Sequence, residues 1–175
     1  SPDDAWELAS KQKRRLLQLT LIGVDSHLPF CVFNVHLPCA FRTPMVMLVH
    51  AALTLETVQT LAETKPYVLA GDFNFRPGSP AYRLMTEGGD RRSDFEPSHI
   101  YITPELGANV IPVRSAYVVA ETREPRFTNY SWTRDMPEHF YDTIDYVFVS
   151  PEFKVEGVSK LRDGMPTMTF PNADE

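Results

Sequence analysis

One stretch of the chain, residues 67–74, limits the possible folds more than any other. It reads YVLAGDFN and runs into RPGSP, a segment rich in proline and glycine that is typical of a loop. The apolar first half predicts a buried strand, and Asp72 and Asn74 stand at its end. In α/β sheets, ligands bind at the carboxyl ends of strands, because the sheet fixes the backbone there while the following loop is free to vary. The stretch therefore predicts an α/β sheet with a functional site at the tip of this strand.

Asp72 and Asn74 form a pair of polar residues on either side of Phe73. On an extended backbone, this alternation would point both side chains to the same face. A carboxylate beside a carboxamide suits a hard cation, a water molecule that is being deprotonated, or a phosphate oxygen. Asp and Asn after a strand are as often turn formers that bond their own backbone. The pair alone leaves a turn and a functional site equally open.

Length and composition predict one globular domain over residues 1–175. The chain is 43% hydrophobic, which is enough for a core, and no change in composition divides it. No stretch reaches the ~18 consecutive apolar residues of a membrane span, so we expect none. The net charge of -6 argues against a broad nucleic-acid groove, since such grooves need Lys and Arg. It leaves room for a small metal site that handles phosphate, because there the cation supplies the positive charge.

The cysteines and the N-terminus bear on the cellular compartment. Cys31 and Cys39 are too few for a disulfide framework or a zinc cage. Residues 1–6 do not resemble a signal peptide. These features favour a reducing, intracellular compartment.

Further elements are predicted around the central strand. Residues 16–22 and 30–37 read as two strands of an antiparallel hairpin. A long helix is predicted to begin with Thr43 as its N-cap and Pro44 at its first position. Because this helix joins the second strand to the central one, the three elements predict a parallel strand–helix–strand unit. Shorter elements are expected further on, namely a helix at 79–85 and strands at 115–119 and 143–149.

Two more positions stand out because of where their polar groups lie. Asn34 and His36 are two residues apart at the end of their strand, so they share one face. A lone histidine there is more often a satisfied core or rim residue than a catalyst, although the polar partner beside it favours a function. Asp145 lies inside an apolar strand, where a carboxylate needs a histidine, a metal or backbone N–H groups as its partner. Structural hydrogen bonding and a functional role are equally open for Asp145.

Five short strings, taken together and in order, resemble the endonuclease/exonuclease/phosphatase superfamily. They are NVHL at 34–37, GDFN at 71–74, SAY at 115–117, EPRFTNY at 124–130 and IDYVFVS at 144–150. The third and fourth strings are most similar to the branch that contains the Ccr4-type deadenylases, nocturnin, the Angel proteins and the 2′,5′-phosphodiesterase. Their number and order make the signature specific for the superfamily.

The resemblance implies a fold, a cofactor and roles for four residues. The fold is α/β, part of a four-layer sandwich in which two packed mixed β-sheets are flanked by helices. The reaction is hydrolysis of a phosphate ester with Mg²⁺, or with Mn²⁺ in its place. Asp72 would act as the acid/base residue near the attacking water, and Asn74 would hold a phosphoryl oxygen, both of them in the metal shell. His36 would stabilise the charge on the scissile phosphate, and Asp145 would orient a catalytic histidine.

The same resemblance assigns substrate-binding positions and implies parts of the domain outside this sequence. Pro44 and Phe140 stand where the relatives pack against a nucleobase, Asn34 is a supporting residue, and Asn129 is assigned to substrate binding with them. The relatives carry a metal-binding glutamate in a Leu-Gln-Glu-like string before the stretch that resembles this chain, and a Ser-Asp-His string after it. The resemblance therefore covers about the C-terminal half of a domain. We expect the segment alone to be inactive.

Three functions are open from the sequence. The favoured one is a magnesium-dependent phosphodiesterase that hydrolyses RNA as a deadenylase-like 3′-exonuclease, with RNA or a nucleotide as its substrate. The alternative is a catalytically inert structural subunit that retains the fold and binds protein partners in a larger assembly. The third is a phosphatase of a small metabolite, because one site of this superfamily serves many substrates. The carboxylate of Asp145 favours the enzyme, because a drifting pseudoenzyme has little physical reason to keep it.

Overall fold

The computed structural model describes residues 3–13, 15–23, 28–89, 91, 107, 109–131 and 139–161. Helices are interspersed among the strands in the first half of the chain, as is typical of an α/β fold. The order of the elements is α1 (Asp3–Lys11), β1 (Arg15–Ile22), β2 (Pro29–His36), α2 (Pro44–Ala62), β3 (Tyr67–Asp72), α3 (Pro80–Glu87), β4 (Arg114–Ser115), α4 (Ala116–Glu121), β5 (Asn129–Ser131), β6 (Phe140–Asp142) and β7 (Asp145–Val149).

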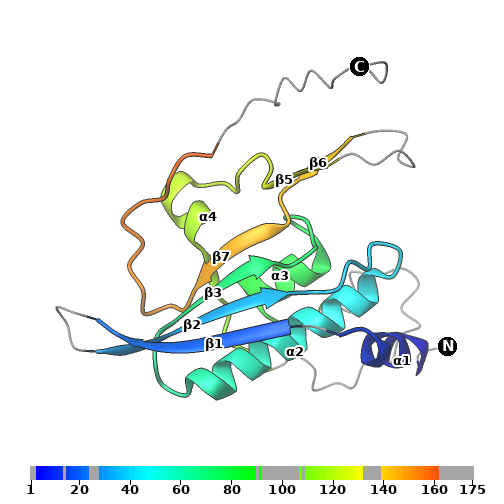
Figure 1. Ribbon diagram of the computed structural model, residues 1–175, viewed down its shortest axis with the longest axis horizontal. Helices are drawn as coiled ribbons and strands as arrows, with labels where there is room; N and C mark the ends of the chain where they lie inside the picture. Colours follow the sequence, from blue (N-terminus) through cyan, green and yellow to red (C-terminus); the bar gives the residue numbers. More distant parts are fainter. Residues whose placement is uncertain are drawn as a thin grey trace, which may run out of the picture.

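A five-stranded mixed sheet with the strand order β1-β2-β3-β7-β4 forms the frame of the molecule, and Figure 1 shows its first four strands side by side. β1 and β2 pair antiparallel, and β2 and β3 pair in parallel on either side of α2 in the chain. The predicted hairpin and the strand–helix–strand unit are therefore confirmed. β7 returns antiparallel to β3 and also pairs with β4, while β5 and β6 form a second, two-stranded sheet. The α/β class, with mixed strands flanked by helices, is confirmed.

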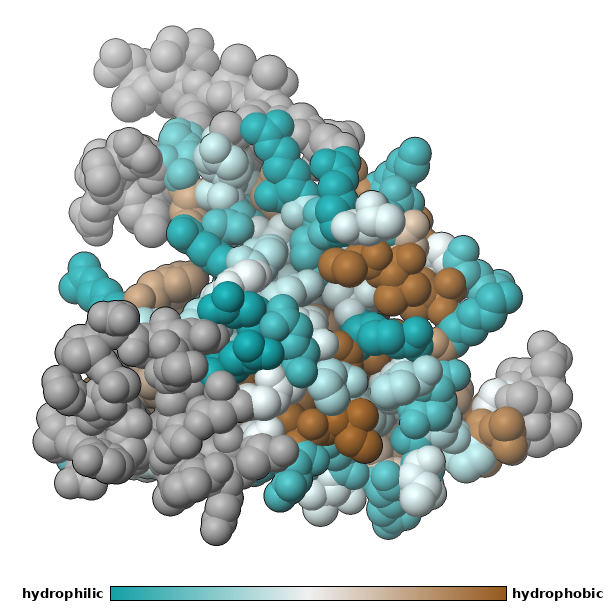
Figure 2. All heavy atoms as spheres, turned by 180° about the vertical axis from the view of Figure 1, so that it is seen from behind, coloured by the Kyte–Doolittle hydropathy of each residue, from teal (hydrophilic) through white to brown (hydrophobic). Residues whose placement is uncertain are grey.

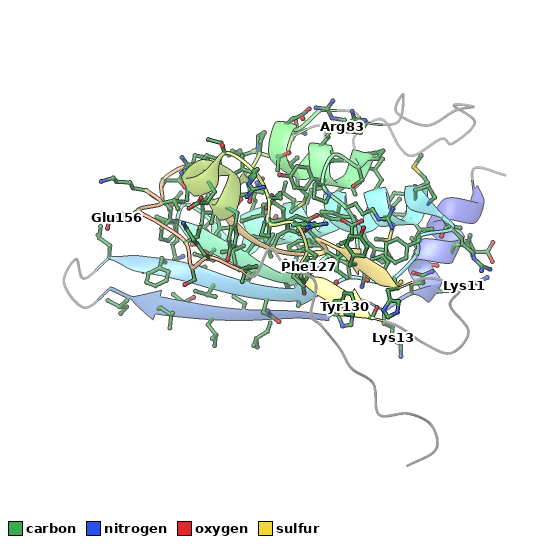
Figure 3. The ribbon with its side chains drawn as sticks, turned by 90° about the horizontal axis from the view of Figure 1, so that it is seen from above. Lys11, Lys13, Arg83, Phe127, Tyr130 and Glu156 are labelled. Atoms are coloured by element: carbon green, nitrogen blue, oxygen red, sulfur yellow. The ribbon has the colours of Figure 1, made fainter. Side chains whose placement is uncertain are left out.

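The core lies between the sheet and the helices α2 and α3, which lie on one side of it (Figures 1 and 3). Alternate residues of β2 point into this core. Cys31, Phe33 and Val35 are buried, whereas Asn34 and His36 on the opposite face are exposed. Figure 2 shows that the coloured surface on the helical side is mainly hydrophilic, with smaller hydrophobic areas between. The helices therefore close this side of the core.

The helix α2 is buried on most of its sides. It packs against β2, and α1 and α3 both pack against it. By length and composition alone α2 could cross a membrane, but 67% of the stretch concerned is buried inside the fold. Such burial is what the core helix of a globular domain shows, so its place in the fold accounts for its apolar character.

The opposite face of the sheet, which we call the open face, carries exposed apolar side chains. Leu17, Leu19 and Leu21 of β1 are 59%, 50% and 43% exposed, and Val147 of β7 is 38% exposed. Figure 3 shows side chains of β1 extending from the sheet on the side away from α2 and α3. None of the described helices covers these leucines, so the open face is a large apolar surface in contact with solvent.

One local prediction is wrong, and another is confirmed in position but not in its hydrogen bond. The sequence predicts a strand at 115–119, but β4 ends at Ser115 and α4 follows at once. The Ser115 hydroxyl accepts a hydrogen bond from Val118 N, and this helix cap outweighs the strand propensity of two adjacent valines. The helix α2 begins at the predicted place, yet Thr43 makes no side-chain cap bond. Its hydroxyl donates to the carbonyl oxygen of Ala40 instead.

Candidate active site

Three of the predicted catalytic residues lie in one row across neighbouring strands. His36 at the end of β2 is the cross-strand partner of Asp72 at the end of β3, and Asp72 is the partner of Asp145 at the start of β7. Cross-strand partners point to the same face of a sheet. Because His36 is exposed on the open face, all three side chains belong to that face. The fold thus gathers residues that are far apart in the sequence at one edge of the sheet.

A close approach of β2 and β3 holds this edge together. Leu37 N donates to the carbonyl oxygen of Asp72 at 2.9 Å, so the pairing continues past His36. Gly71 has φ +139°, and a Cβ at this position would lie 1.9 Å from the carbonyl oxygen of Val35. Only glycine allows the two backbones to approach this closely. The glycine before Asp72 therefore serves the geometry of the site.

The imidazole of His36 faces the carboxylate of Asp72, with Nε2 3.7 Å from Oδ2. The His36 side chain is 66% exposed and that of Asp72 is 31% exposed. Partial burial raises the pKa of the Asp72 carboxyl, the N–H of Asn74 lowers it, and the neighbouring Asp145 raises it further. Two carboxylates close together favour a positive group between them. The row therefore suits either cation binding or proton transfer.

Asn74 does not continue the extended backbone on which the sequence argument relied. β3 ends at Asp72, and Asn74 has φ 55°, in the left-handed region that asparagine tolerates better than most residues. Asp72 Oδ1 accepts a hydrogen bond from Asn74 N at 2.9 Å. Asp72 is therefore a turn former, as one of the two interpretations proposed. Its other oxygen, Oδ2, faces His36 and remains available to bind a cation or to accept a proton.

The side chain of Asn74 is buried and held in one orientation. Its Nδ2 donates to the carbonyl oxygen of Leu37 at 2.8 Å. This bond uses the amide nitrogen and leaves the amide oxygen available to a cation or to a donor on a ligand. The left-handed turn thus brings the carboxamide back toward β2 and keeps it beside Asp72.

Asp145 has a hydrogen-bond partner, as a carboxylate in an apolar strand requires. Thr128 Oγ1 donates to Asp145 Oδ2 at 2.7 Å and accepts from the backbone N–H groups of Ile144 and Asp145, each at 3.0 Å. These three bonds fix the hydroxyl, which in turn fixes the carboxylate. The partner is a threonine, a residue type that the sequence argument did not consider for this role.

A pocket of about 600 Å³ lies beside the row, past the end of β3. It contains both predicted metal ligands and three of the predicted substrate-binding residues. These five are Pro44, Asp72, Asn74, Asn129 and Phe140. His36 and Asp145 are not among the residues that line it, and neither is Asn34, whose Nδ2 donates to the carbonyl oxygen of Ala70 at 3.4 Å. The structure therefore places Asn34 on the open face, two residues before His36, rather than in the pocket.

The pocket combines aromatic and polar groups. One wall is aromatic: the ring centroids of Phe41 and Phe140 lie 5.9 Å apart, and Pro44 adjoins them. The carboxylate of Asp72 and the thiol of Cys39 also line the pocket. Burial raises the pKa of this thiol and the nearby Asp72 raises it further, so Cys39 stays protonated at neutral pH. Such a pocket suits a ligand with one flat apolar part and one charged part.

The described residues supply part of a shell for a divalent cation. The carboxylate of Asp72 and the amide oxygen of Asn74 are hard oxygen donors, the kind that Mg²⁺ and Mn²⁺ prefer. The second carboxylate, Asp145, increases the negative charge there. No group of three His, Cys, Asp or Glu side chains able to hold a metal ion occurs in the part of the chain that the structure describes. The donors therefore fit a cation that takes its other ligands from water, substrate or further residues.

Three residues of the site have no role in the sequence argument. Thr128 lies in the string EPRFTNY, but no spacing connects it with Asp145, because their contact depends on how the chain folds back between β5 and β7. Phe41 and Arg76 lie in loops, where no periodicity sets the direction of a side chain. A sequence signal for them is therefore lacking.

Comparison with known proteins agrees with this fold. The model of the Endonuclease/Exonuclease/phosphatase family matches residues 9–167, which is most of the chain. The chain therefore belongs to this family, and the predicted superfamily is confirmed. Members of the superfamily are phosphoester hydrolases, a chemistry that the paired carboxylates and the histidine of this site can serve.

Individual relatives are similar over part of their length. Carbon catabolite repressor protein 4 homolog 4 of Arabidopsis thaliana is 32% identical over 99 residues, which make up 57% of this chain and 20% of that protein. The structure of the human nocturnin catalytic domain with a bound sulfate anion has a TM-score of 0.53 at 18% identity, covering 81% of this chain and 43% of that one. The mannosyl-6-phosphatase of Bacteroides thetaiotaomicron has a TM-score of 0.51 at 20% identity, covering 79% and 43%. The chain thus spans less than half the length of these relatives, and the two solved structures share its fold.

Proposed function

We propose that the protein containing this segment is a magnesium-dependent phosphodiesterase that hydrolyses RNA from its 3′ end, with the segment supplying part of the active site. The observation that carries the proposal is the row of His36, Asp72 and Asp145 beside a pocket that contains Asn74. The resemblance of the chain to the Ccr4-type branch supports RNA as the substrate.

Each side chain of the row has a distinct role in this proposal. Asp72 Oδ2 takes the proton of the attacking water, while Oδ1 stays in its turn with Asn74. His36, beside Asp72 and exposed, donates to a phosphate oxygen and stabilises the charge that develops there. Asp145, fixed by Thr128, orients a catalytic histidine from a part of the domain outside the described residues.

A divalent cation would be held by Asp72 and Asn74. When bound, Mg²⁺ supplies Lewis-acid stabilisation of the negative charge on the phosphate. The chain itself contributes the arrangement of the donors: the turn keeps the carboxylate and the carboxamide together, and the bond to Leu37 uses the amide nitrogen, so that the amide oxygen stays available. Negative charge from Asp145 favours cation binding at the same place.

The pocket would hold the nucleobase next to the scissile bond. Phe41 and Phe140 offer flat aromatic surfaces, and Pro44 adds a rigid apolar contact. Stacking of a base on an aromatic side chain contributes about 1–3 kcal/mol. Asn129 lies in the same pocket and can donate to or accept from the edge of a base.

The test is an assay of the full-length protein on a 5′-labelled oligoadenylate with and without Mg²⁺. We expect Mg²⁺-dependent shortening from the 3′ end. Asp72→Asn should lower kcat by about a thousandfold, because the amide can still accept the Asn74 N–H but cannot take a proton. Glu156→Gln is the control. It also replaces a carboxylate by a carboxamide, but at an exposed position, labelled in Figure 3, and should leave the rate unchanged.

Two other outcomes would replace the proposal. Release of inorganic phosphate from small phosphomonoesters, without any shortening of the RNA, would identify a phosphatase. Absence of metal-dependent cleavage of every phosphoester tested would favour the inert structural subunit.

A further inference from the structure

Arg76 differs in charge from the other described residues that line the pocket. Of the described residues that line the pocket, it alone carries a positive charge, whereas Asp72 is a carboxylate. Its side chain crosses from the loop after β3 to β6 on the other side. There its Nε lies 2.8 Å from Asp142 Oδ2, and its Cζ lies over the ring of Phe140, 5.6 Å from the centroid. Arg76 therefore connects the loop that carries Asn74 with the aromatic wall.

The surroundings of Arg76 hold it in place before any ligand binds. Its backbone is part of a turn in which Ser79 N donates to the Arg76 carbonyl oxygen at 3.2 Å, and Pro77 stiffens that turn. Its partner Asp142 is fixed in turn, because Asp142 Oδ1 accepts from Thr143 N at 2.9 Å. Pre-ordering of this kind lowers the entropy that is lost when a ligand binds.

The side chain is nevertheless accessible. The Arg76 side chain is 58% exposed although its Nε contacts Asp142. An exposed ion pair contributes only about 0–1 kcal/mol to stability, so stability alone is a weak reason for an arginine at this place. A guanidinium carries five N–H donors, more than its contact with one carboxylate uses, so an exposed guanidinium in the pocket of an anionic substrate is suited to a phosphate.

We propose that Arg76 is a specificity-determining residue that binds a non-scissile phosphate of the substrate, next to the nucleotide whose base lies in the pocket. The inference rests on the proposed function. It means that the site selects substrates with at least two phosphates along the strand over those with the scissile phosphate alone. Asp142 is a positioning residue in this scheme, since it acts through Arg76. In this proposal the cation site and His36 bind the scissile phosphate, and Arg76 binds the adjacent, non-scissile phosphate.

The experiment compares two substrates on the full-length protein with Mg²⁺: an oligoadenylate, and the dinucleoside monophosphate ApA, whose single phosphate is the scissile one. Arg76→Met should reduce kcat/KM for the oligoadenylate about tenfold more than for ApA, mainly through KM. The slope of log KM against log salt for the oligoadenylate should fall by about one, as for the loss of one phosphate contact.

Further variants separate charge, geometry and position. Arg76→Lys should restore part of the preference for the oligoadenylate, because it keeps the charge but not the planar fork. Asp142→Asn should shift the preference in the same direction as Arg76→Met and by less, because Asn can still accept the N–H of Thr143. Arg91→Met is the matched control, since it removes an arginine from an ion pair with Glu87 and should leave the ratio of the two substrates unchanged.

The outcomes distinguish this inference from the function on which it rests. If the wild-type protein cleaves neither substrate, the proposed function fails. If it cleaves both and Arg76→Met lowers them equally, with the salt slope unchanged, Arg76 is only a structural link between the pocket walls and the inference is overturned. A loss of preference with a reduced salt slope supports it.

Discussion

The two faces of the five-stranded sheet are made by the same strands but differ in what covers them. On the face that packs against α2, Phe33, Leu69 and Phe148 are fully buried. On the open face, Leu19 is 50% exposed and Val147 is 38% exposed. Both faces are apolar, so the difference lies in the packing and not in the composition of the strands.

The predicted catalytic side chains of the row lie on only one of these two faces. His36, Asp72 and Asp145 belong to the open face, at the edge where the strands end. A contiguous exposed apolar surface marks a place where something else packs. Since the chain spans 43% of the nocturnin catalytic domain, we expect residues beyond this segment to cover the open face in the full-length protein and to approach the site from that side.

The largest expected effect contrasts two leucines of the same sheet. Leu69→Ala removes a fully buried side chain on the helix-covered face and should lower the free energy of unfolding by about 2–5 kcal/mol. Leu19→Ala on the open face should cost less than about 0.5 kcal/mol in the 175-residue chain. Urea unfolding followed by circular dichroism measures both.

The same pair of variants tests whether the open face is covered. In the full-length protein we expect the cost of Leu19→Ala to rise to about 2 kcal/mol or more, because the side chain would then be buried. An equally small cost in both lengths of chain would show that the open face stays in solvent. The cost of Leu69→Ala should be similar in both and serves as the reference.

A smaller effect is expected where the helix-covered face supports the site. The buried Tyr146 hydroxyl donates to the carbonyl oxygens of Phe75 and Thr143, at 2.9 and 3.0 Å, and so connects the loop after β3 with the turn before β7. Tyr146→Phe leaves both carbonyls without this donor and should cost about 1–2 kcal/mol. Tyr141→Phe, at an exposed ring of β6, is the control and should be neutral within about 0.5 kcal/mol. Equal values for the two variants in urea unfolding would refute a role for the buried hydroxyl.

The sequence predicts the strands and helices of this fold better than its loops. β3 and α2 could be predicted because a buried strand and a buried helix both need apolar side chains, which recur in the sequence at the spacing of each element. The convergence of His36 and Asp72 also followed from the sequence, since a parallel strand–helix–strand unit brings both carboxyl ends to one edge. The start of α4 did not follow, because one serine cap decides it against the strand propensity of its valines.

The loops carry the parts of the site that could not be predicted. The left-handed backbone of Asn74 departs from the extended backbone expected from alternation, and asparagine tolerates this conformation without specifying it. Thr128 reaches Asp145, and Arg76 reaches Asp142, only because separate segments meet in the folded chain. Such contacts depend on tertiary packing, which a local pattern does not record.

The smallest expected effect is a pH dependence at the edge where the two faces meet. Burial and Asp145 raise the pKa of Asp72 above its usual 3.8 in the folded chain. As the pH rises through the window between 3.8 and the raised pKa, the unfolded chain loses its proton first, so the folded state becomes less stable. Asp72→Asn removes this loss while keeping the acceptor for Asn74 N. In the absence of divalent cations, the variant should gain stability relative to wild type on going from below pH 3.8 to pH 7, by a modest amount because the side chain is partly exposed. Urea unfolding at both pH values measures this gain. If the difference in unfolding free energy between variant and wild type does not change with pH, the fold does not raise the pKa of Asp72 and the prediction fails.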